Sequence, residues 1–349
     1  MKILHVLNTG RYSGAENVVI TLINSSKNET DSFAYTSPDG QIAEILKKNE
    51  ILFFPTSGNR MKITELKKVI KKYRPDIIHT HDYNAGIVAT LTMTKTPIVN
   101  HLHNNTPWMK TFNLKSIIYG LSTIRYKHIY MVSDSVRNEY IFKFLFKNKS
   151  EIVGNPLDIK KIEELAREED CEFANQFDVV FLGRLADQKR PLMFISIMKK
   201  ICKSLPTLKA IMVGSGPLES DVKKAISENG LEQNVFMAGF QNNPYSILSK
   251  CKVLCMPSAW EGFGLAAIES MCLGLPVVAS PVGGLTNIID EDCGSLCDSI
   301  DDFCNEIYEL ISCPEKYKEK SKNARIRANE LVDLQGYKTK IAKGYERCI

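Results

Sequence analysis

The chain of 349 residues is long for a single hydrophobic core and long enough for two α/β domains. Hydrophobic residues make up 44% of it and charged residues 24%, which is typical of a folded protein and excludes an intrinsically disordered chain. No stretch has the apolar length that crosses a bilayer, and residues 1–7 are too short an apolar run for a signal peptide. We therefore expect a cytoplasmic protein, either free or peripheral at the inner face of the cell membrane.

Charge is distributed unevenly along the chain. Residues 1–155 carry 21 lysines and arginines against 12 aspartates and glutamates, a net charge of +9, so the remainder carries −4 of the total of +5. Within the first part, residues 101–150 hold 8 basic and 2 acidic residues. A basic face suits a phosphate-bearing acceptor or an anionic membrane surface, although a solvated lysine-rich surface explains the count equally well. We expect no nucleic-acid partner.

Short apolar runs alternate with amphipathic stretches over the first 155 residues. The runs predict buried parallel strands and the stretches predict helices between them, which is the pattern of βαβ units. The expected strands are Ile3–Leu7, Ile77–Ile78, Ile98–Val99 and Ile129–Val132, and the expected helices are residues 15–25, 61–73 and 84–94.

A second series of the same kind follows the segment Val153-Gly154-Asn155-Pro156, whose Gly, Asn and Pro mark a domain boundary. After a charged helical stretch at residues 158–170, the expected strands are Val179–Leu182, Lys209–Val213, Val235–Ala238, Val253–Met256 and Pro276–Ala279. We therefore predict two Rossmann-like domains with parallel sheets, at residues 1–155 and 156–325, with ligand sites at the carboxyl ends of strands in the crevice between them. Residues 326–349 predict a polar C-terminal helix that packs back across both domains.

Cysteines and histidines occupy different halves of the chain. The ten cysteines lie at or beyond Cys171 and the six histidines at or before His128, so a zinc site of mixed ligands would have to join the two halves. Two pairs of cysteines have CxxxC spacing, but both lie in apolar, strand-like stretches. We therefore expect reduced core cysteines, with no disulfide and no metal site.

The strongest chemical pattern is a glycine-rich turn after the predicted strand Val253–Met256. A helix begins near Gly264, and the free backbone N–H groups at a helix start bind anions. Gly262 and Gly264 allow the backbone to approach a phosphate closely. The turn therefore predicts a phosphate site.

Two carboxylates, Glu261 and Glu269, flank this turn eight residues apart. Eight residues at helical rise span roughly 12 Å, whereas a glycosidase pair is separated by roughly 5–9.5 Å. The spacing therefore favours gripping two ends of a long ligand. In this interpretation Glu269 accepts ribose hydroxyls, Glu261 faces a sugar, and a diphosphate lies on the amides between them.

Two cations follow the predicted strand Val179–Leu182. Arg184 supplies a forked donor at the strand end, and Lys189 supplies a point charge across the next loop. Two fixed cations can stabilise a departing diphosphate without Mg²⁺. The loop Thr9–Glu16, after the first strand, can open a helix at Ser13 or Gly14, although an ordinary βα turn explains it equally well.

In order and spacing, these elements resemble glycosyltransferase family 4, whose GT-B fold consists of two facing Rossmann-like domains. Ser13-Gly14-Ala15-Glu16 resembles the family's Gly-Gly-Ala-Glu loop, with serine in place of the first glycine. The Glu261–Glu269 spacing, with Gly-Phe-Gly between, is similar to its E-x₇-E motif. Further matches are Phe181-Leu182-Gly183-Arg184 through Lys189, Val213-Gly214-Ser215-Gly216-Pro217, Pro276-Val277-Val278-Ala279-Ser280 and Gly283-Gly284. The chain departs from the family near Asn287, where a glutamate is common, so we assign no ligand contact there.

The resemblance implies a retaining, metal-independent transfer from a nucleotide-diphosphate sugar, with UDP as the expected nucleotide. Carried over residue by residue, Arg184 and Lys189 hold the diphosphate, Glu269 the ribose and Glu261 the transferred sugar. Backbone at Phe263–Leu265 and at Gly14 completes the phosphate site, and Phe240 lies near the base. His103, which Asn104 follows, matches a histidine that contacts the transferred sugar. The N-terminal domain would present a glycan or lipid-linked acceptor, in cell-surface polysaccharide synthesis.

Three other functions are weighed against this one. An NAD-dependent oxidoreductase is rejected because the nearest Gly-x-Gly-x-x-Gly candidate, Gly214–Glu219, ends in glutamate and lies mid-chain. A nucleotide-sugar 2-epimerase of similar fold stays as the alternative enzyme. A non-catalytic partner protein that binds sugar nucleotides is the third, and it would be favoured by loss of Arg184, Lys189 or either glutamate, all of which are present.

Overall fold

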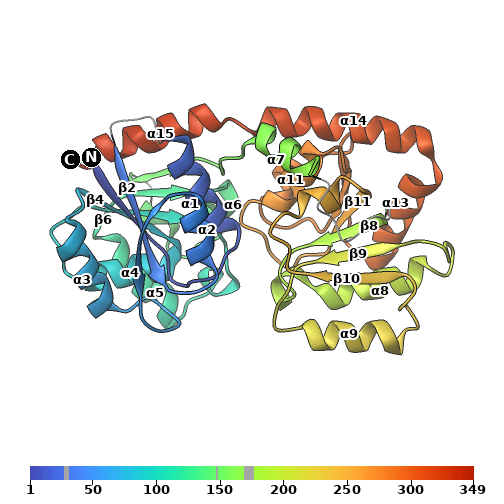
Figure 1. Ribbon diagram of the computed structural model, residues 1–349, viewed down its shortest axis with the longest axis horizontal. Helices are drawn as coiled ribbons and strands as arrows, with labels where there is room; N and C mark the ends of the chain where they lie inside the picture. The colour runs from blue at the N-terminus through green and yellow to red at the C-terminus, as the bar shows by residue number, and fades with distance from the viewer. Residues whose placement is uncertain (27–30, 147, 169–176) are drawn as a thin grey trace. The chain divides into compact units, whose positions relative to one another are not determined.

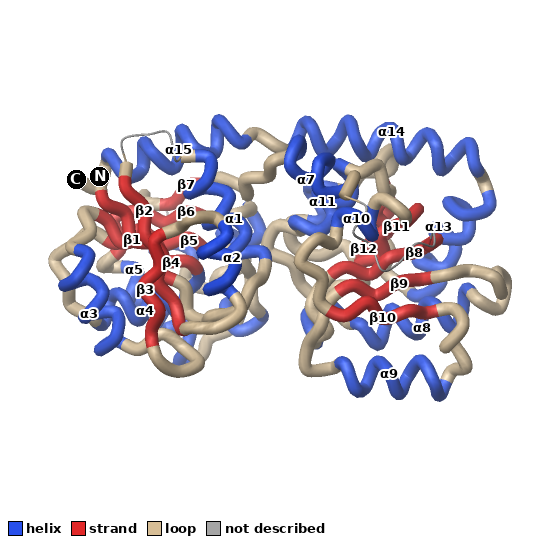
Figure 2. Tube along the Cα trace, in the orientation of Figure 1, coloured by secondary structure: helices blue, strands red, loops and turns tan. Residues whose placement is uncertain are grey.

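The computed structural model of the chain describes residues 1–26, 31–146, 148–168 and 177–349. It divides the chain into two compact units, drawn in Figures 1 and 2: unit 1 is Met1–Leu157 with Asp333–Ile349, and unit 2 is Asp158–Val332. The boundaries therefore fall at 157/158 and 332/333, rather than at the expected 155/156 and 325/326. Each unit is an α/β domain with a parallel sheet, as the alternating pattern predicts.

In its described residues, unit 1 contains a seven-stranded parallel sheet in the order β3-β2-β1-β4-β5-β6-β7. The strands are β1 (Lys2–Val6), β2 (Ser32–Pro38), β3 (Leu52–Thr56), β4 (Ile77–His81), β5 (Ile98–Leu102), β6 (Tyr126–Met131) and β7 (Ser150–Ile152). The helices are α1 (Gly14–Ser25), α2 (Ile42–Lys48), α3 (Ile63–Tyr73), α4 (Asp82–Leu91), α5 (Leu114–Thr123) and α6 (Asp134–Asn138), with short 3-10 turns η1 (Pro107–Lys110) and η2 (Lys143–Phe146). The order reverses between β1 and β4, where doubly wound sheets bind ligands.

Unit 2 repeats this plan with a sheet of six strands among its described residues, in the order β10-β9-β8-β11-β12-β13. The strands are β8 (Phe177–Leu182), β9 (Ala210–Val213), β10 (Val235–Gly239), β11 (Cys251–Met256), β12 (Val277–Ala279) and β13 (Gly294–Leu296). The helices are α7 (Ile159–Ala166), α8 (Pro191–Ile201), α9 (Glu219–Glu228), α10 (Tyr245–Leu248), α11 (Leu265–Cys272), α12 (Leu285–Ile288), α13 (Ile300–Ser312) and α14 (Pro314–Leu331), with a 3-10 turn η3 (Asp187–Lys189). The helix expected at 158–170 is α7, and residues 169 and 170 of that expectation lie outside the described residues.

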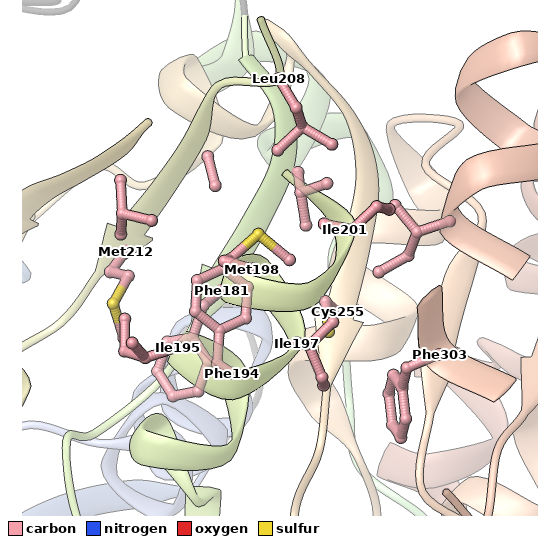
Figure 3. Close-up of a cluster of buried hydrophobic side chains, with 14 of the residues drawn as sticks. Phe181, Phe194, Ile195, Ile197, Met198, Ile201, Leu208, Met212, Cys255 and Phe303 are labelled. Carbon is pink, nitrogen blue, oxygen red and sulfur yellow. The ribbon is translucent and has the colours of Figure 1, made fainter. Parts of the chain in front are cut away.

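The core of unit 2 lies between its sheet and the helices α8, α9 and α13 (Figure 3). Phe181 of β8 packs against Phe194 of α8, with ring centroids 5.4 Å apart, and Phe303 of α13 closes the same cluster. Cys255 is fully buried among these residues. The nine described cysteines are free; seven of them are buried, but Cys202 is half-buried and Cys313 is exposed, so the expectation of core cysteines fails at these two positions. Cys171 lies outside the described residues.

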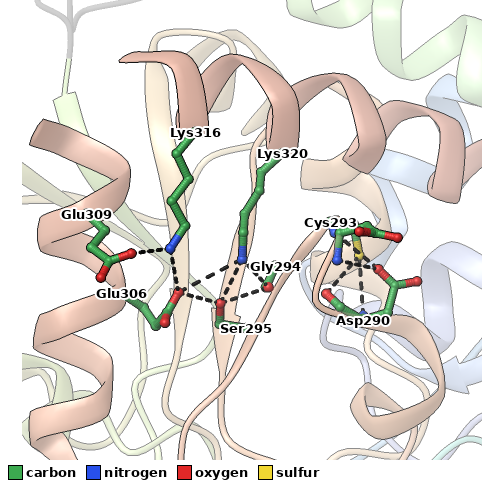
Figure 4. A network of polar contacts seen from close by, with 9 residues as sticks. Asp290, Cys293, Gly294, Ser295, Glu306, Glu309, Lys316 and Lys320 are labelled. Atoms are coloured by element: carbon green, nitrogen blue, oxygen red, sulfur yellow. Dashed lines mark hydrogen bonds and ion pairs between the residues drawn. The ribbon is translucent and has the colours of Figure 1, made fainter. Parts of the chain in front are cut away.

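Helix α14 is tied to the edge of this sheet by a polar network (Figure 4). The buried ammonium of Lys320 donates to the carbonyl of Gly294 (2.7 Å) and the hydroxyl of Ser295 (3.1 Å). Ser295 donates in turn to Glu306 of α13 (2.6 Å), whose carboxylate also lies 3.9 Å from Lys320. A buried lysine is tolerated here because its charge and its donors are both matched.

The C-terminal segment differs from the single helix expected at residues 326–349. Helix α14 ends at Leu331 within unit 2, and a separate helix α15 (Leu334–Glu346) belongs to unit 1. The break occurs because Asp333 caps the new helix, accepting a hydrogen bond from the backbone N–H of Gly336 (2.7 Å). Tyr345 of α15 then meets His79 of β4, with 2.6 Å between the Tyr hydroxyl and Nδ1. The chain therefore returns to unit 1, but with two helices in place of one.

A buried carboxyl lies at the start of α1 in unit 1. Glu16 is 5% exposed and accepts a hydrogen bond from the hydroxyl of Ser13. Burial raises the pKa of Glu16 from 4.5 to about 7. Because the folded chain holds this proton more tightly than the unfolded chain does, the resulting stabilisation is complete below pH 4.5 and is lost as the pH rises through about 7.

We predict that Glu16→Gln stabilises the protein at pH 8 and has little effect at pH 5. A pKa unit corresponds to about 1.4 kcal/mol, so the gain at pH 8 reaches about 3 kcal/mol at most. Urea unfolding followed by tryptophan fluorescence and circular dichroism at both pH values measures it. The control is Glu44→Gln on α2, where the side chain is exposed. Equal stability of Glu16→Gln and the wild type at pH 8 would contradict the prediction.

Candidate functional site

The predicted site residues of unit 2 lie at the carboxyl ends of β8 and β11, which pair in the middle of the sheet. Strand β8 leads to Arg184 and then to η3, which ends at Lys189. Strand β11 leads to the turn of residues 257–264, and α11 begins directly after it. The chain turns from β8 toward β9 on one side, while β11 lies on the other, so this is the switch point of the unit 2 sheet.

Lys189 and Glu261 form a buried ion pair at this edge, with Nζ of the lysine donating to Oε1 of the glutamate. Ser258 donates to the same oxygen at 2.8 Å. Glu261 is 5% exposed, so a cation and a hydroxyl compensate for its lost hydration. The sequence interpretation gave the two residues to different parts of the ligand and did not predict their contact.

Backbone contacts hold the two loops together around this pair. The N–H of Ala259 donates to the carbonyl of Gln188 (2.8 Å), and the side-chain amide of Gln188 donates to the carbonyl of Trp260 (3.1 Å). Lys189 is therefore positioned against Glu261 by the neighbours of both residues, 72 positions apart in sequence.

Glu269, the other carboxylate of the motif, lies within α11 and is 8% exposed. The hydroxyl of Tyr245, in α10, donates to its Oε1 at 3.0 Å. Burial raises the pKa of Glu269 above its ordinary value, while the Tyr245 hydrogen bond and the charge of Lys189 act in the opposite direction. Tyr245 was missed by sequence reasoning because it lies 24 residues from Glu269 on a helix of four residues with no distinctive motif.

The turn itself requires glycines. Gly264 precedes α11 with φ of 101°, in the left-handed region that disfavours side chains. The matched glycines Gly283 and Gly284 lie against it: a Cβ on the first would overlap the carbonyl oxygen of Glu261, and on the second that of Phe263. The backbone of residues 283–284 therefore supports the glycine-rich turn by close packing.

A second glycine contact supports Arg184. A Cβ on Gly214 would overlap the carbonyl oxygen of Gly183, and one on Gly216 would overlap that of Leu185. The N–H of Gly214 also donates to the carbonyl of Gly239 (2.7 Å), the last residue of β10. Arg184 is exposed at this strand end, and the side chain of Phe240 is 38% exposed after β10. The glycines of the Val-Gly-x-Gly-Pro turn thus serve loop packing.

Helix α14 contacts the C-terminal ends of α11 and α12. Arg325 donates to the carbonyls of Cys272 (2.9 Å) and Leu273 (2.6 Å), at the C-terminal end of α11. Arg327 donates to the carbonyls of Asn287 (2.9 Å) and Ile288 (3.2 Å), at the end of α12. Cations at helix C-termini satisfy free carbonyls and complement the helix dipole. The position of α11, and hence of Glu269, therefore depends on this helix.

The two remaining predicted residues, Gly14 and His103, lie in unit 1. Gly14 is the first residue of α1, and Ser13 before it has extended backbone. His103 follows β5, and its Nε2 lies 2.9 Å from Nδ1 of His81. Burial lowers the pKa of His103 to about 3, so the imidazole is neutral near pH 7. The structure places these two residues in a different unit from the other predicted site residues, which unit 2 holds together.

In the described parts of the chain, the side chains that lie close enough together to bind a metal ion are histidines. Two groups of three ligand side chains lie close enough together to hold one ion, and both consist of unit 1 histidines. In the described part of unit 2, no such group lies at the glycine-rich turn.

Two family models match the chain one after the other. Residues 5–161 match the model described as Glycosyltransferase Family 4, and residues 162–327 match the model described as Glycosyl transferases group 1. The junction at 161/162 falls close to the boundary between the two structural units at 157/158.

The curated relatives of this chain include proteins named as glycosyltransferases. An uncharacterized glycosyltransferase of Methanocaldococcus jannaschii is 29% identical over 68% of this chain, which spans 65% of that relative. The UDP-Gal:alpha-D-GlcNAc-diphosphoundecaprenol alpha-1,3-galactosyltransferase of Escherichia coli is 26% identical over 89% of this chain and 87% of its own length.

A solved structure agrees in fold over nearly the whole length. The Anabaena protein Alr3699/HepE, crystallised in complex with UDP and glucose, superposes with a TM-score of 0.85 over 98% of both chains at 21% identity. This similarity shows the GT-B fold, and the two family models with the named relatives identify the chain as a glycosyltransferase, in which a glycosyltransferase family 4 match is followed by a group 1 match.

Proposed function

We propose that this glycosyltransferase binds a nucleotide-diphosphate sugar at the glycine-rich turn of unit 2 and transfers the sugar with retention of configuration and without a metal ion. The observation that carries the proposal is the arrangement of Arg184, the Lys189–Glu261 pair and Glu269 at the ends of two adjacent strands. It offers cations for a diphosphate and a buried carboxylate on each side of the turn.

Each part of the donor then has a partner of suitable chemistry. The diphosphate accepts hydrogen bonds from the free N–H groups at the start of α11 and lies beside Arg184. Glu269 exchanges its bond with Tyr245 for bonds from ribose hydroxyls. The diphosphate also competes with Glu261 for Lys189, so charge develops on the leaving group where a cation is already held.

Retention requires the acceptor hydroxyl to approach from the face that the diphosphate leaves. The departing phosphate oxygen then lies within reach of the acceptor proton and takes it as the C1–O bond breaks and the new bond forms. Glu261 stabilises the oxocarbenium-like sugar in between. By the family resemblance, His103 contacts the transferred sugar and Gly14 the phosphate.

UDP is the proposed nucleotide, and a lipid-linked or glycan acceptor is the proposed partner. Support comes from the relatives, since the Escherichia coli enzyme is named for transfer from UDP-Gal onto a diphosphoundecaprenol-linked sugar. A Campylobacter jejuni relative, 23% identical over 95% of this chain, is also named for an undecaprenol-linked substrate. Cell-surface polysaccharide synthesis is the setting that such acceptors indicate.

An anionic membrane surface is the second proposed partner, through residues 101–150. Helix α5 exposes Leu114, Ile118 and Leu121, which recur at helical spacing on one face. Phe112, two residues before α5, and Phe144, within η2, are exposed as well. The exposed basic residues described in this segment are Lys110, Lys115, Arg125, Lys127 and Lys143. An exposed apolar stripe with a basic surround suits an interfacial helix.

Part of this segment is core, as Tyr119 and Phe146 are fully buried. Lys147, which the sequence interpretation also included, lies outside the described residues. No helix among the described residues is long and apolar enough to cross a bilayer. The proposed contact is with the membrane surface.

We predict that the protein pellets with vesicles containing anionic lipid and less with neutral vesicles, and that salt weakens the association. Each basic residue near an anionic surface contributes about 1 kcal/mol. Leu121→Gln removes exposed apolar area and should weaken partitioning roughly tenfold. Leu52→Gln, on the edge strand β3, is the control with a half-exposed leucine. Salt-independent pelleting that is equal for both lipids would disprove the surface contact.

We predict that Glu269→Gln and Glu261→Gln fail in different ways. Ribose is remote from the breaking bond, so Glu269→Gln should raise the donor KM more than it lowers kcat, by roughly 1.5–3 kcal/mol of charged hydrogen bonding. Glu261→Gln should lower kcat, because it removes negative charge beside the oxocarbenium-like sugar. It also frees Lys189 for the diphosphate, so donor affinity should be kept or improved.

Calorimetry of donor binding, beside steady-state rates, separates these effects. Glu315→Gln, an exposed glutamate on α14, serves as the control. Loss of binding alone in Glu261→Gln, with loss of turnover alone in Glu269→Gln, would reverse the two assignments.

We predict that transfer survives EDTA, because Arg184 and Lys189 provide the positive charge that Mg²⁺ provides in metal-dependent enzymes. Initial rates are compared before and after EDTA treatment and gel filtration. A loss of turnover that Mg²⁺ or Mn²⁺ restores would refute the metal-free reaction.

The experiment that tests the function as a whole is a thermal-shift screen with UDP-, GDP- and ADP-sugars. A ligand that binds only the folded chain raises its melting temperature, and the shift grows with the logarithm of the ligand concentration divided by its Kd. We expect a UDP-sugar to give the largest shift and Glu269→Gln to reduce it. Release of an epimerised nucleotide sugar in the absence of acceptor would instead favour the 2-epimerase, and binding with no turnover on any acceptor would favour a non-catalytic partner.

A further inference from the structure

Unit 1 contains a layer of histidines that the proposed transfer reaction does not explain. His5, His79 and His101 lie in β1, β4 and β5, in a register that pairs His5 with His79 and His81 with His101. Because alternate residues of a strand face the same side, His79 and His81 share one face of the sheet. His103 follows β5 with its ring stacked on that of His101, at 4.2 Å between centroids.

Hydrogen bonds account for only part of this layer. Nδ1 of His5 lies 3.0 Å from Nε2 of His81, and Nδ1 of His81 lies 2.9 Å from Nε2 of His103. His101 is fully buried, yet neither of its ring nitrogens has a hydrogen-bond partner among the described residues. A buried polar group without a partner costs about 1–3 kcal/mol, and a metal ion on one of these nitrogens relieves part of that cost.

We propose that His81, His101 and His103 bind a single Zn²⁺ ion. Their ligand nitrogens all lie within 4.8 Å of one another. The 2.9 Å between Nδ1 of His81 and Nε2 of His103 is close to the separation of about 3.3 Å that two nitrogens have in a tetrahedral zinc site, so Zn²⁺ replaces the shared proton with a small movement. The open fourth position takes water.

The surroundings of these three imidazoles suit zinc. Nε2 of His81 contacts His5, which fixes the ring as ligand histidines require. The carboxylate of Asp82, which accepts from the backbone N–H of His103 (3.3 Å), supplies nearby negative charge.

A second group, His5, His79 and His81, is less suitable. All three rings are buried, and the hydroxyl of Tyr345 already lies 2.6 Å from Nδ1 of His79. His103 is only partly buried, so an ion from solvent reaches the first group through it. His101, with both nitrogens unpartnered, also belongs only to the first group.

Zinc at this site inhibits transfer, a consequence that rests on the proposed function. His103 is the imidazole that the family resemblance assigns to the transferred sugar, and a coordinated imidazole cannot make that contact. Removal of zinc therefore leaves activity intact or raises it, in agreement with the expected survival in EDTA.

Zinc binding is measured by calorimetry with ZnCl₂ alone on untagged protein that has been stripped with EDTA and desalted. We expect one equivalent to bind the wild type, and His101→Gln to weaken binding at least tenfold. His128→Gln is the matched control, because His128 lies on β6 of the same sheet, contacts Glu151 at 3.7 Å and belongs to neither group of three. Cobalt(II) in place of zinc should show the intense visible bands of a tetrahedral site, lost in the same variant.

Equal binding by the wild type and His101→Gln, or equal loss in His128→Gln, would overturn the site. If circular dichroism shows that His101→Gln does not fold, His103→Gln, at a less buried position, makes the same comparison. In the transfer assay, His101→Gln should keep its rate without zinc and resist inhibition by zinc. Binding is read without donor or acceptor, so failure of the proposed transfer would leave the zinc measurement unchanged.

Discussion

The ion pair between Lys189 and Glu261 is the interaction on which the proposed donor site depends. A carboxylate that is 5% exposed is stable only with a cation and hydrogen bonds around it, and Lys189 and Ser258 supply both. This requirement fixes the loop after β8 against the turn after β11. A ligand with two phosphates then meets a site whose positive charge is already ordered, which is what transition-state stabilisation needs.

The loops around this pair are held from outside the motif. Gly283 and Gly284 pack on the backbone of the turn, and Arg325 and Arg327 hold the C-terminal ends of α11 and α12. None of these residues carries chemistry of its own. They explain why a site made of loops keeps a defined geometry. The glycines allow close contact between two backbone segments, and the arginines bind the carbonyls at the helix ends.

Continuous apolar runs in the sequence predicted strands, because a strand that is buried on both faces of a parallel sheet consists of such a run. This pattern missed β2, where Thr36 and Ser37 are buried polar residues, and β3, where Leu52 is half-exposed and Pro55 interrupts the run. Edge strands and strands with buried hydroxyls lack the apolar signal. The C-terminal break at Asp333 was missed because a capping aspartate inside a polar stretch resembles an ordinary surface residue.

Within the site, motif spacing predicted which residues unit 2 brings to one edge of its sheet, but not their mutual contacts. The bond from Tyr245 to Glu269 and the pair of Lys189 with Glu261 join positions 24 and 72 residues apart, and only the sheet order determines that they meet. The contacts within the histidine layer were not predicted for the same reason. His5, His81 and His101 are separated in sequence and become adjacent only through the β1-β4-β5 order.

The two units bury different kinds of polar side chain at the carboxyl ends of their strands. Unit 2 keeps charged groups at its carboxyl edge and pairs them, so the edge is ready for an anion. Unit 1 buries His81 and His101 on the neighbouring strands β4 and β5, with His103 directly after β5, and their ring nitrogens lie within 4.8 Å of one another. The same sheet architecture thus presents a cationic site in one unit and a potential metal site in the other, and the difference follows from which side chains the strand ends carry.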